Sequence, residues 1–330
     1  MSKKMIVFAV AGDEGDALKR FTKELDIDAE LIEAQLGMDT VALTEGYEAV
    51  SVLGFDDVSR PVVEKLAANG VKYVALRSAG YNNVDVDAMR EFNIRFSNAT
   101  YSPNCVADYT VMHILMAIRK FKRTALKSAS GNYSRSGIQG KEMHNLTIGI
   151  IGTGRIGATV ARNLSGFGSK ILGYDVYEND HLRDILEYTS LEQLIASSDV
   201  ITLHTPLFKE NVHMINAESI AKMKDGVVII NCARGELIDT DALVEALESG
   251  KVASAGLDVI ENEVGIFHHD HSGDVLDNHD LSVLNGMNTV TVTPHMAFYT
   301  DQAVSDMVEV ALRSLTSFVE TGESQWEIKK

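Results

Sequence analysis

Three side chains suited to acting on a charged carbonyl compound follow short apolar runs in the second half of the chain. They are Arg234 in NCARGELID, Glu263 in GLDVIENEVG and His295 in TPHMAFYT. A guanidinium keeps its charge at any working pH and can hold a carboxylate through two parallel hydrogen bonds. An imidazole titrates near neutrality and can give or take a proton, and a neighbouring carboxylate would keep it protonated. Together these residue types predict carboxylate binding and acid–base chemistry at a carbonyl.

Each of the three segments also has a plainer interpretation. Arg234 fits a surface turn, and the acidic run of Asp258, Glu261 and Glu263 fits a solvated loop. A single histidine such as His295 is more often structural than catalytic. The hypothesis therefore depends on the elements that must bring the three segments together.

A glycine-rich turn, GTGRIG, directly follows the apolar run LTIGII and opens a helical pattern. In that context Gly152 permits the tight turn, Gly154 lets the backbone approach a pyrophosphate, and Gly157 lets the helix pack close to the strand. The helix N-terminus would then offer N–H groups to the phosphates. Asp175 ends the next apolar run, eighteen residues after Gly157, where a carboxylate binds ribose hydroxyls and repels a 2′-phosphate. We therefore predict NAD rather than NADP as cofactor, with a glycine turn of an unrelated α/β protein as the alternative.

Apolar runs alternate with helical patterns along the chain, which is typical of α/β folds with parallel sheets. The pattern changes near residue 100, where Ser102 and Pro103 fit the start of a helix, and the amphipathic segment 300–322 is expected to return to the first series. We predict two Rossmann-like, doubly wound domains with a cleft between them: an NAD-binding domain over 101–298, inserted in a discontinuous substrate domain of 1–100 and 299–330. The predicted strands cover 5–10, 48–53, 72–76, 146–152, 169–175, 199–204, 226–233, 252–259 and 288–293, and one long buried helix covers 103–126.

Composition and charge exclude several classes of protein. The 330 residues are 45% hydrophobic and 23% charged, which is ordinary for a folded soluble protein of two domains. A net charge of −17 without a basic stripe argues against a nucleic-acid partner. No apolar run reaches the roughly 18 residues of a membrane helix, and acidic residues interrupt the N-terminal run, which favours a strand over a signal peptide. Cys105 and Cys232 form no disulfide framework, so we expect free thiols and a cytoplasmic protein.

Beyond these patterns, the chain resembles the D-2-hydroxyacid dehydrogenases, and within them the group of D-lactate and D-2-hydroxyisocaproate dehydrogenases. The resemblance extends over nearly the whole chain, and its motifs taken together are highly specific. They are RSAGYNNVD (77–85), YSPNCVADYT (101–110), IGIIGTGRIG (148–157), ITLHTPL (201–207), NCARGELID (231–239), GLDVIENEVGIF (256–267) and TPHMAFYT (293–300).

The resemblance implies an NAD-dependent, reversible reduction of a 2-keto acid to the D-2-hydroxy acid. It implies that Arg234 binds the substrate carboxylate and polarises the carbonyl, that His295 gives the carbonyl oxygen a proton, and that Glu263 orients His295. Hydride would pass between the nicotinamide and substrate C2. Matches to substrate-binding positions are Leu53, Ala79, Gly80, Tyr101, Arg234 and Phe298. Matches to cofactor-binding positions are Gly152, Gly154, Arg155, Ile156, Gly157, Asp175, Thr205, Pro206, Asn211, Cys232, Ala233 and Asp258.

Three positions depart from the pattern of this family. Cys232 stands where many relatives have Thr, and Met296 where Thr or Ile is common. Leu53 lies where lactate-preferring relatives often carry Tyr. Because a smaller aliphatic wall enlarges a pocket, we expect tolerance for 2-ketoisocaproate or phenylpyruvate besides pyruvate, with modest selectivity.

Other functions remain as alternatives. Phosphoglycerate dehydrogenase and formate dehydrogenase share the architecture, although the first needs basic residues for a phosphate and the second carries Gln at the position of Glu263. An NAD(H)-sensing scaffold, like the family's corepressors, can keep all three candidate residues. We expect no metal site, because the histidines of FHHDHSGD (267–274) match no standard zinc spacing. We also expect a homodimer through the NAD-binding domain, since relatives are commonly dimers and the helix predicted over 103–126 is apolar enough to contribute.

Overall fold

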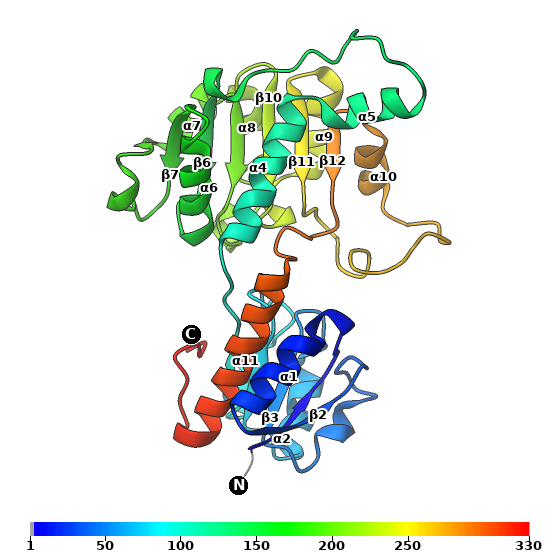
Figure 1. Ribbon diagram of the computed structural model, residues 1–330, viewed down its shortest axis with the longest axis vertical. Helices are drawn as coiled ribbons and strands as arrows, with labels where there is room; N and C mark the ends of the chain where they lie inside the picture. Colours follow the sequence, from blue (N-terminus) through cyan, green and yellow to red (C-terminus); the bar gives the residue numbers. More distant parts are fainter. Residues whose placement is uncertain (1–2, 330) are drawn as a thin grey trace. The chain divides into compact units, whose positions relative to one another are not determined.

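A computed structural model of the chain describes residues 3–329. The chain forms two compact units, the first made of Met1–Ser102 with Tyr299–Lys330 and the second of Pro103–Phe298. Each unit is a parallel sheet covered by helices on both faces (Figure 1), which is the predicted fold class. No helix among the described residues is long and apolar enough to cross a membrane.

The sheet of the first unit has five parallel strands in the order β2-β1-β3-β4-β5. Side chains alternate between its two faces along each strand. Met5 and Val7 pack against one face, while Ile6 of the same strand packs on the other. The strands are β1 (Lys3–Val7), β2 (Ile27–Leu31), β3 (Ala49–Val52), β4 (Tyr73–Leu76) and β5 (Arg95–Ser97).

The helices of the first unit follow this alternation. Two helices, α1 (Gly15–Glu24) and α11 (Asp301–Thr321), cover the face of Met5 and Val7. The opposite face is covered by α2 (Arg60–Ala68) and α3 (Val86–Glu91). Because the strands are parallel, the carboxyl ends of β1, β3 and β4 meet at one edge of the sheet.

Arg77 lies just beyond β4 and is fully buried, with 0% of its surface exposed. Its Nε donates to Oε1 of Glu14 at 2.7 Å, and its other nitrogens donate to Ser51 Oγ at 3.0 Å and to the Phe8 carbonyl at 2.8 Å. A buried guanidinium is tolerated only when it is paired and hydrogen-bonded in this way. Arg77 thus ties together the ends of β1, β3 and β4.

Replacing Arg77 with methionine is expected to destabilise the first unit by about 3–5 kcal/mol, because the carboxylate of Glu14 is left buried and uncompensated. Urea unfolding together with amide hydrogen exchange in β1 and β4 measures the loss. Arg60→Met, which breaks the exposed pair with Glu91, is the control and should cost at most about 1 kcal/mol. Equal losses in the two variants would refute the role given to Arg77.

The sheet of the second unit has seven parallel strands in the order β12-β11-β10-β9-β6-β7-β8. The order reverses between β6 and β9, and open α/β sheets bind ligands at such a switch point, outside the carboxyl ends of the strands. The strands are β6 (Thr147–Ile151), β7 (Lys170–Tyr174), β8 (Glu187–Tyr188), β9 (Val200–Leu203), β10 (Val227–Asn231), β11 (Val252–Leu257) and β12 (Val290–Val292).

Helices lie on both faces of this sheet (Figure 1). On one face α4 (Asn104–Ile118) packs over β10 and β11, and α6 (Arg155–Ser165) over β6 and β7. The other face is covered by α7 (Leu191–Ser197), α8 (Ala217–Lys222), α9 (Thr240–Ser249) and α10 (His279–Gly286). Short 3-10 turns lie at Gly12–Glu14, Val41–Thr44, Met143–Asn145, Asp180–Leu182, Lys209–Asn211 and Gly235–Leu237.

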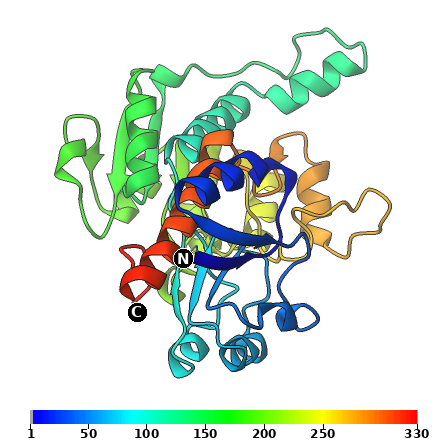
Figure 2. The ribbon, with the colours of Figure 1, turned by 60° about the horizontal axis from the view of Figure 1, so that its bottom comes forward.

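The long helix predicted over 103–126 is wrong in two respects. The chain turns at Lys120, whose φ of +51° is left-handed, so α4 ends at Ile118 and a separate helix, α5, covers Phe121–Ala129. The helix also begins one residue later than predicted, with Pro103 rather than Ser102 at the N-cap. In Figure 2, α5 and the loop after it lie at the outside of the second unit.

Three strands escaped the sequence analysis, namely β2, β5 and β8. In β2, IDAEL, only Ile27 is buried, because the strand lies at the edge of its sheet. The other two also lie at sheet edges and are two or three residues long. Such edge strands lack the apolar run by which buried parallel strands are recognised.

Candidate active site

Arg234, Glu263 and His295 all lie beyond the carboxyl ends of neighbouring strands in the second unit. They follow β10, β11 and β12, which are adjacent in the sheet. Because the strands are parallel, these ends meet at one edge, where ligands bind in folds of this kind. The structure thus brings the three predicted residues to a common edge.

His295 and Glu263 form a direct pair. The distance from His295 Nδ1 to Glu263 Oε1 is 2.5 Å, and the second oxygen of Glu263 accepts the backbone N–H of Ile260 at 3.1 Å. Both side chains are partly exposed, at 31% and 20%. A carboxylate accepting from Nδ1–H fixes the ring orientation and leaves Nε2 as the nitrogen for proton transfer.

Two further rings lie beside the imidazole of His295. The centroids of Phe298 and His268 are 6.4 Å and 6.0 Å from it. Burial, followed by the nearby His295, lowers the pKa of His268. His268 therefore favours its neutral form, in a loop, FHHDHSGD, whose residues after Phe267 are mostly exposed.

Arg234 follows β10 in an extended conformation, with φ −142°. The side-chain amide of Asn231 donates to the Arg234 carbonyl at 2.7 Å, and Nη1 of Arg234 donates to the Ala233 carbonyl at 2.6 Å. The next residue, Gly235, passes so close to the loop after β11 that an added Cβ would lie 2.1 Å from the carbonyl carbon of Ile260. Only glycine lets the segment of Arg234 approach the loop that carries Glu263.

Asp258 directly follows β11 and is fully buried, with 0% exposed. Its Oδ1 accepts from Thr293 Oγ1 at 2.6 Å and from the Met296 N–H at 2.9 Å, and its Oδ2 accepts from the Ala297 N–H at 2.8 Å. The carboxylate therefore binds the turn on which His295 lies. This partnership was not part of the sequence analysis, which matched Asp258 only to a cofactor-binding position.

Glu261 has a partner that sequence reasoning missed. Its Oε1 lies 2.6 Å from His213 Nε2, and its Oε2 accepts from the backbone N–H and the hydroxyl of Thr240. This hydrogen bond to Glu261 raises the pKa of His213. The acidic run after β11 is thus a set of three differently engaged carboxylates, not a solvated loop. His213 and Glu261 are 48 residues apart, and no local pattern links them.

The glycine turn follows β6 with the geometry that a pyrophosphate requires. Gly152 has φ +91°, and a Cβ there would lie 2.7 Å from the His204 carbonyl carbon. A Cβ on Gly157 would lie 1.9 Å from the Gly152 carbonyl oxygen, whereas around Gly154, at the N-cap of α6, nothing lies within 4 Å. Backbone N–H groups at the start of α6 are therefore open to an approaching phosphate, so these residues fit a dinucleotide.

Asp175 follows β7 beside this turn. Its Oδ2 accepts from the Thr153 N–H at 2.6 Å, and its Oδ1 accepts from the Tyr177 N–H at 3.0 Å. The next two side chains, Val176 and Tyr177, are 77% and 86% exposed and carry no charge. The site offers a fixed carboxylate followed by two exposed, uncharged side chains, which suits a ribose with a free 2′-hydroxyl.

The variant Asp175→Asn is expected to raise the KM for NADH about tenfold and to increase the relative use of NADPH by roughly 10–100-fold, because the hydrogen bond to a charged acceptor and the repulsion of a 2′-phosphate are both lost. Steady-state kinetics with both cofactors measures the shift. Glu178→Gln, which removes a nearby exposed carboxylate, serves as control. A similar shift in both variants would show that the effect is one of net charge alone.

The other predicted cofactor positions surround the same edge. Thr205 and Pro206 follow β9, and Asn211 donates from Nδ2 to the Pro206 carbonyl at 2.8 Å. Cys232 follows β10 and is buried, which raises the pKa of its thiol. Burial also lowers the pKa of His204 to about 3, so its ring stays neutral behind the turn. Arg155 and Ile156 begin α6, and Ala233 precedes Arg234.

Four predicted substrate-binding residues lie in the first unit. Leu53 follows β3, and its N–H donates to Asp56 Oδ2 at 2.6 Å; burial raises the pKa of that carboxyl to about 6. Ala79 and Gly80 follow β4, and their carbonyls accept from Asn98 Nδ2 and Ser78 Oγ. Tyr101 lies at the end of the first segment of this unit, whereas the other two predicted residues, Arg234 and Phe298, lie in the second unit.

Comparisons with known proteins find similar sequences and structures over the chain. The family model for "D-isomer specific 2-hydroxyacid dehydrogenase, NAD binding domain" matches residues 111–297. The chain is 44% identical over 317 residues to an aromatic 2-oxoacid reductase of Clostridium sporogenes, a match that covers 96% of each protein. It is 40% identical over 329 residues to a D-lactate dehydrogenase of Lactiplantibacillus plantarum, covering 99% of each. The structure of a D-lactate dehydrogenase from Treponema pallidum aligns with a TM-score of 0.92 at 32% identity, over 99% of this chain and 100% of that one.

Proposed function

This chain belongs to the D-2-hydroxyacid dehydrogenase family and is an NAD-dependent oxidoreductase. We propose that Arg234, Glu263 and His295 catalyse the reduction of a 2-keto acid by NADH in this protein. The observation that carries the proposal is the His295–Glu263 pair, which leaves Nε2 available at the strand edge that also carries Arg234. An imidazole turned away from the substrate could not serve as the acid in this reaction.

In the proposed mechanism Arg234 holds the substrate carboxylate and polarises the adjacent carbonyl. His295 gives its Nε2 proton to the carbonyl oxygen while Glu263 stabilises the ring through Nδ1. When bound, the reduced nicotinamide supplies the hydride that C2 receives. The products are the 2-hydroxy acid and NAD⁺, and His295 regains a proton from water. In the reverse direction His295 takes the proton from the hydroxyl.

We infer that the substrate is a 2-keto acid with a bulky side chain. Leu53 supports this inference because a leucine leaves more room than the tyrosine of lactate-preferring relatives. The similarity to an aromatic 2-oxoacid reductase supports it as well. The test is kcat/KM for NADH oxidation with pyruvate, 2-ketoisocaproate, phenylpyruvate and hydroxypyruvate, with the chirality of the product determined.

We expect phenylpyruvate or 2-ketoisocaproate to match or exceed pyruvate and to give the D-hydroxy acid. A strong preference for pyruvate would contradict the inference about side-chain size. A preference for a phosphorylated substrate would favour a phosphoglycerate dehydrogenase. Tight NADH binding without turnover of any keto acid would favour the NAD(H)-sensing scaffold and overturn the proposed reaction.

Glu263→Gln is expected to lower kcat for keto acid reduction about tenfold, because an amide holds Nδ1 of His295 less firmly than a carboxylate and orients the ring less well. Steady-state kinetics with a saturating keto acid measures this loss. Glu261→Gln is the matched control, since Glu261 pairs with His213 instead. An unchanged kcat in Glu263→Gln, or an equal loss in both variants, would count against the pairing of Glu263 with His295.

We propose that one unit binds mainly the substrate and the other binds NAD. Residues 1–100 with 299–330 would form the substrate domain, with Leu53, Ala79, Gly80 and Tyr101 as contacts to the keto acid. Residues 101–298 would form the NAD-binding domain, which contains the match to the family model. Both cysteines, Cys105 and Cys232, are buried and form no disulfide with each other, which supports a reducing, cytoplasmic location.

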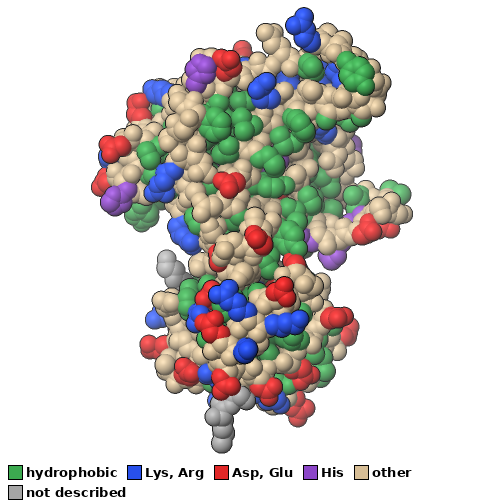
Figure 3. Space-filling model, viewed as in Figure 1, with side chains coloured by type: hydrophobic (Ala, Val, Ile, Leu, Met, Phe, Trp, Pro, Cys, Tyr) green, Lys and Arg blue, Asp and Glu red, His purple; other side chains and the backbone are tan. Residues whose placement is uncertain are grey.

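We also propose that the protein is a homodimer through α4, α5 and the loop after them. Large apolar side chains are exposed there, including Phe121 at 55%, Leu126 at 50% and Tyr133 at 82%. Figure 3 shows hydrophobic side chains gathered over α4. Such an apolar surface is typical of an interface between subunits.

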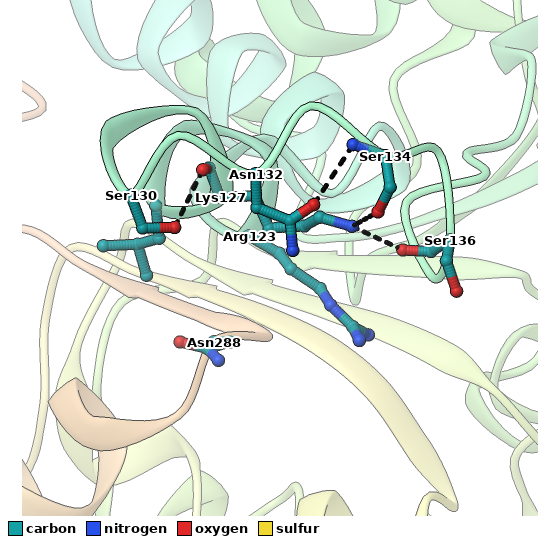
Figure 4. Close-up of a pocket in the computed structure, with 8 residues that line it drawn as sticks. Arg123, Lys127, Ser130, Asn132, Ser134, Ser136 and Asn288 are labelled. Atoms are coloured by element: carbon teal, nitrogen blue, oxygen red, sulfur yellow. Dashed lines mark hydrogen bonds between the residues drawn. The ribbon is translucent and has the colours of Figure 1, made fainter.

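The loop after α5 is held in shape by its own contacts. Lys127 donates from Nζ to Ser134 Oγ at 3.0 Å and to the Ser136 carbonyl at 2.8 Å (Figure 4). An ordered loop can present a fixed surface to a second copy. Sedimentation equilibrium tests the proposal: a mass of twice 36.0 kDa is expected, and a monomer would contradict it. Between α5, the loop after it and Asn288 lies a hollow. It is lined by Arg123, Leu126, Lys127, Ser130, Asn132, Ser134, Ser136 and Asn288.

A further inference from the structure

We propose that His113, a buried residue of α4, is a positioning residue for His295, acting through Thr293 and Asp258. The inference rests on the proposed role of His295 as the acid of the reaction. His113 touches none of the proposed reacting groups, and no sequence motif pointed to it.

The turn that carries His295 needs support, because His295 has φ +55°. This left-handed conformation is unfavourable for residues other than glycine. Asp258 provides this support on both sides of His295. Its side chain binds Thr293, Met296 and Ala297, and its backbone carbonyl accepts the N–H of His295 at 2.7 Å. The position of the imidazole therefore depends on how Asp258 is held.

Thr293 connects helix α4 to the turn that carries His295, because its hydroxyl lies beside both Asp258 and His113. The hydroxyl of Thr293 has one proton, which it donates to Asp258 Oδ1 at 2.6 Å. Toward any other partner the hydroxyl can only accept. His113 Nε2 lies 3.2 Å from the same oxygen, so the bond requires His113 to carry its proton on Nε2.

The surroundings of His113 agree with this tautomer. The residue is 0% exposed, and its Nδ1 has no hydrogen-bond partner among the described residues. Burial lowers the pKa of His113, which keeps the ring neutral with a single N–H. The ring fits only because residue 256 of β11 is glycine, since a Cβ there would lie 2.6 Å from Nδ1.

A buried imidazole with one unpaired nitrogen is costly compared with an apolar side chain of similar size. A leucine in α4 would pack against β11 without that cost. The contribution of His113 must therefore come from its Nε2–H. By donating to Thr293, it orients the hydroxyl toward Asp258 and so fixes the turn of His295.

The test compares His113→Leu, His113→Gln, Thr293→Val and the double variant His113→Leu/Thr293→Val. His113→Leu is expected to lower kcat about tenfold, as small displacements of catalytic groups do, with the Kd of NADH within about twofold of the parent. Glutamine keeps an N–H donor and should restore most of kcat. Thr293→Val should match His113→Leu, and the double variant should lose no more than either single one, because they act as one unit.

Ile114→Ala is the matched control for general damage, since Ile114 is the next residue of α4 and is also 0% exposed. It should lower thermal stability but leave kcat within about twofold. The inference is overturned if His113→Leu keeps the parent kcat, if His113→Gln loses as much as His113→Leu, or if Ile114→Ala lowers kcat equally. Failure of the proposed function is distinguishable, because the parent protein would then show no His295-dependent turnover of any keto acid.

Discussion

Arg234→Gln should bind NADH normally yet lose about 10²–10⁴ in kcat/KM for keto acid reduction. Glutamine has neither the charge nor the planar fork that pairs with a carboxylate, and losing one partner of such a charged pair costs about 2–5 kcal/mol. The loss should appear in KM through weaker carboxylate binding and in kcat through weaker polarisation of the carbonyl.

Arg234→Lys separates these two contributions. A lysine keeps the positive charge but not the bidentate geometry, so we expect partial recovery of KM and little recovery of kcat. Fluorescence titration with NADH checks that the cofactor site is intact in both variants. Keto acid reduction by Arg234→Gln at near the parent efficiency would remove Arg234 from the site.

His295→Ala should lower kcat for reduction by about 10²–10⁴, the usual contribution of a general acid, with a much smaller change in KM. Without Nε2–H the negative charge that forms on the carbonyl oxygen has no positioned proton donor. Stopped-flow measurement of NADH oxidation separates this chemical step from product release.

The neighbouring histidine provides the control for that result. His268 lies 6.0 Å from His295, between ring centroids, but is not paired with Glu263. His268→Phe keeps a ring there and should retain kcat within about tenfold. Parent-like turnover in His295→Ala, or an equal loss in His268→Phe, would mean that the acid has been assigned to the wrong residue.

The cofactor turn and the strand-end residues could be predicted because their signals are local. The glycines of GTGRIG and the acid of Asp175 lie at fixed spacings around one strand–turn–helix unit, and the positive φ of Gly152 agrees with that pattern. Arg234, Glu263 and His295 each follow an apolar run, and the parallel sheet alone suffices to bring such ends together.

Other features depend on contacts that no local pattern encodes. His113 and Thr293 are 180 residues apart, and His213 and Glu261 are 48 apart. The break between α4 and α5 falls at Lys120, and no neighbouring glycine or proline indicates it in the sequence. The edge strand β2 is mostly polar because only one of its residues is buried. In each case tertiary packing, rather than local preference, decides the structure.

The most direct test of the proposed chemistry is a crystal structure of the protein with NADH and oxamate, an unreactive analogue of pyruvate. We predict that the oxamate carboxylate binds the guanidinium of Arg234, that its carbonyl oxygen lies about 3 Å from His295 Nε2, and that Glu263 still holds Nδ1. An imidazole of His295 turned away to solvent, with oxamate bound elsewhere, would contradict the account.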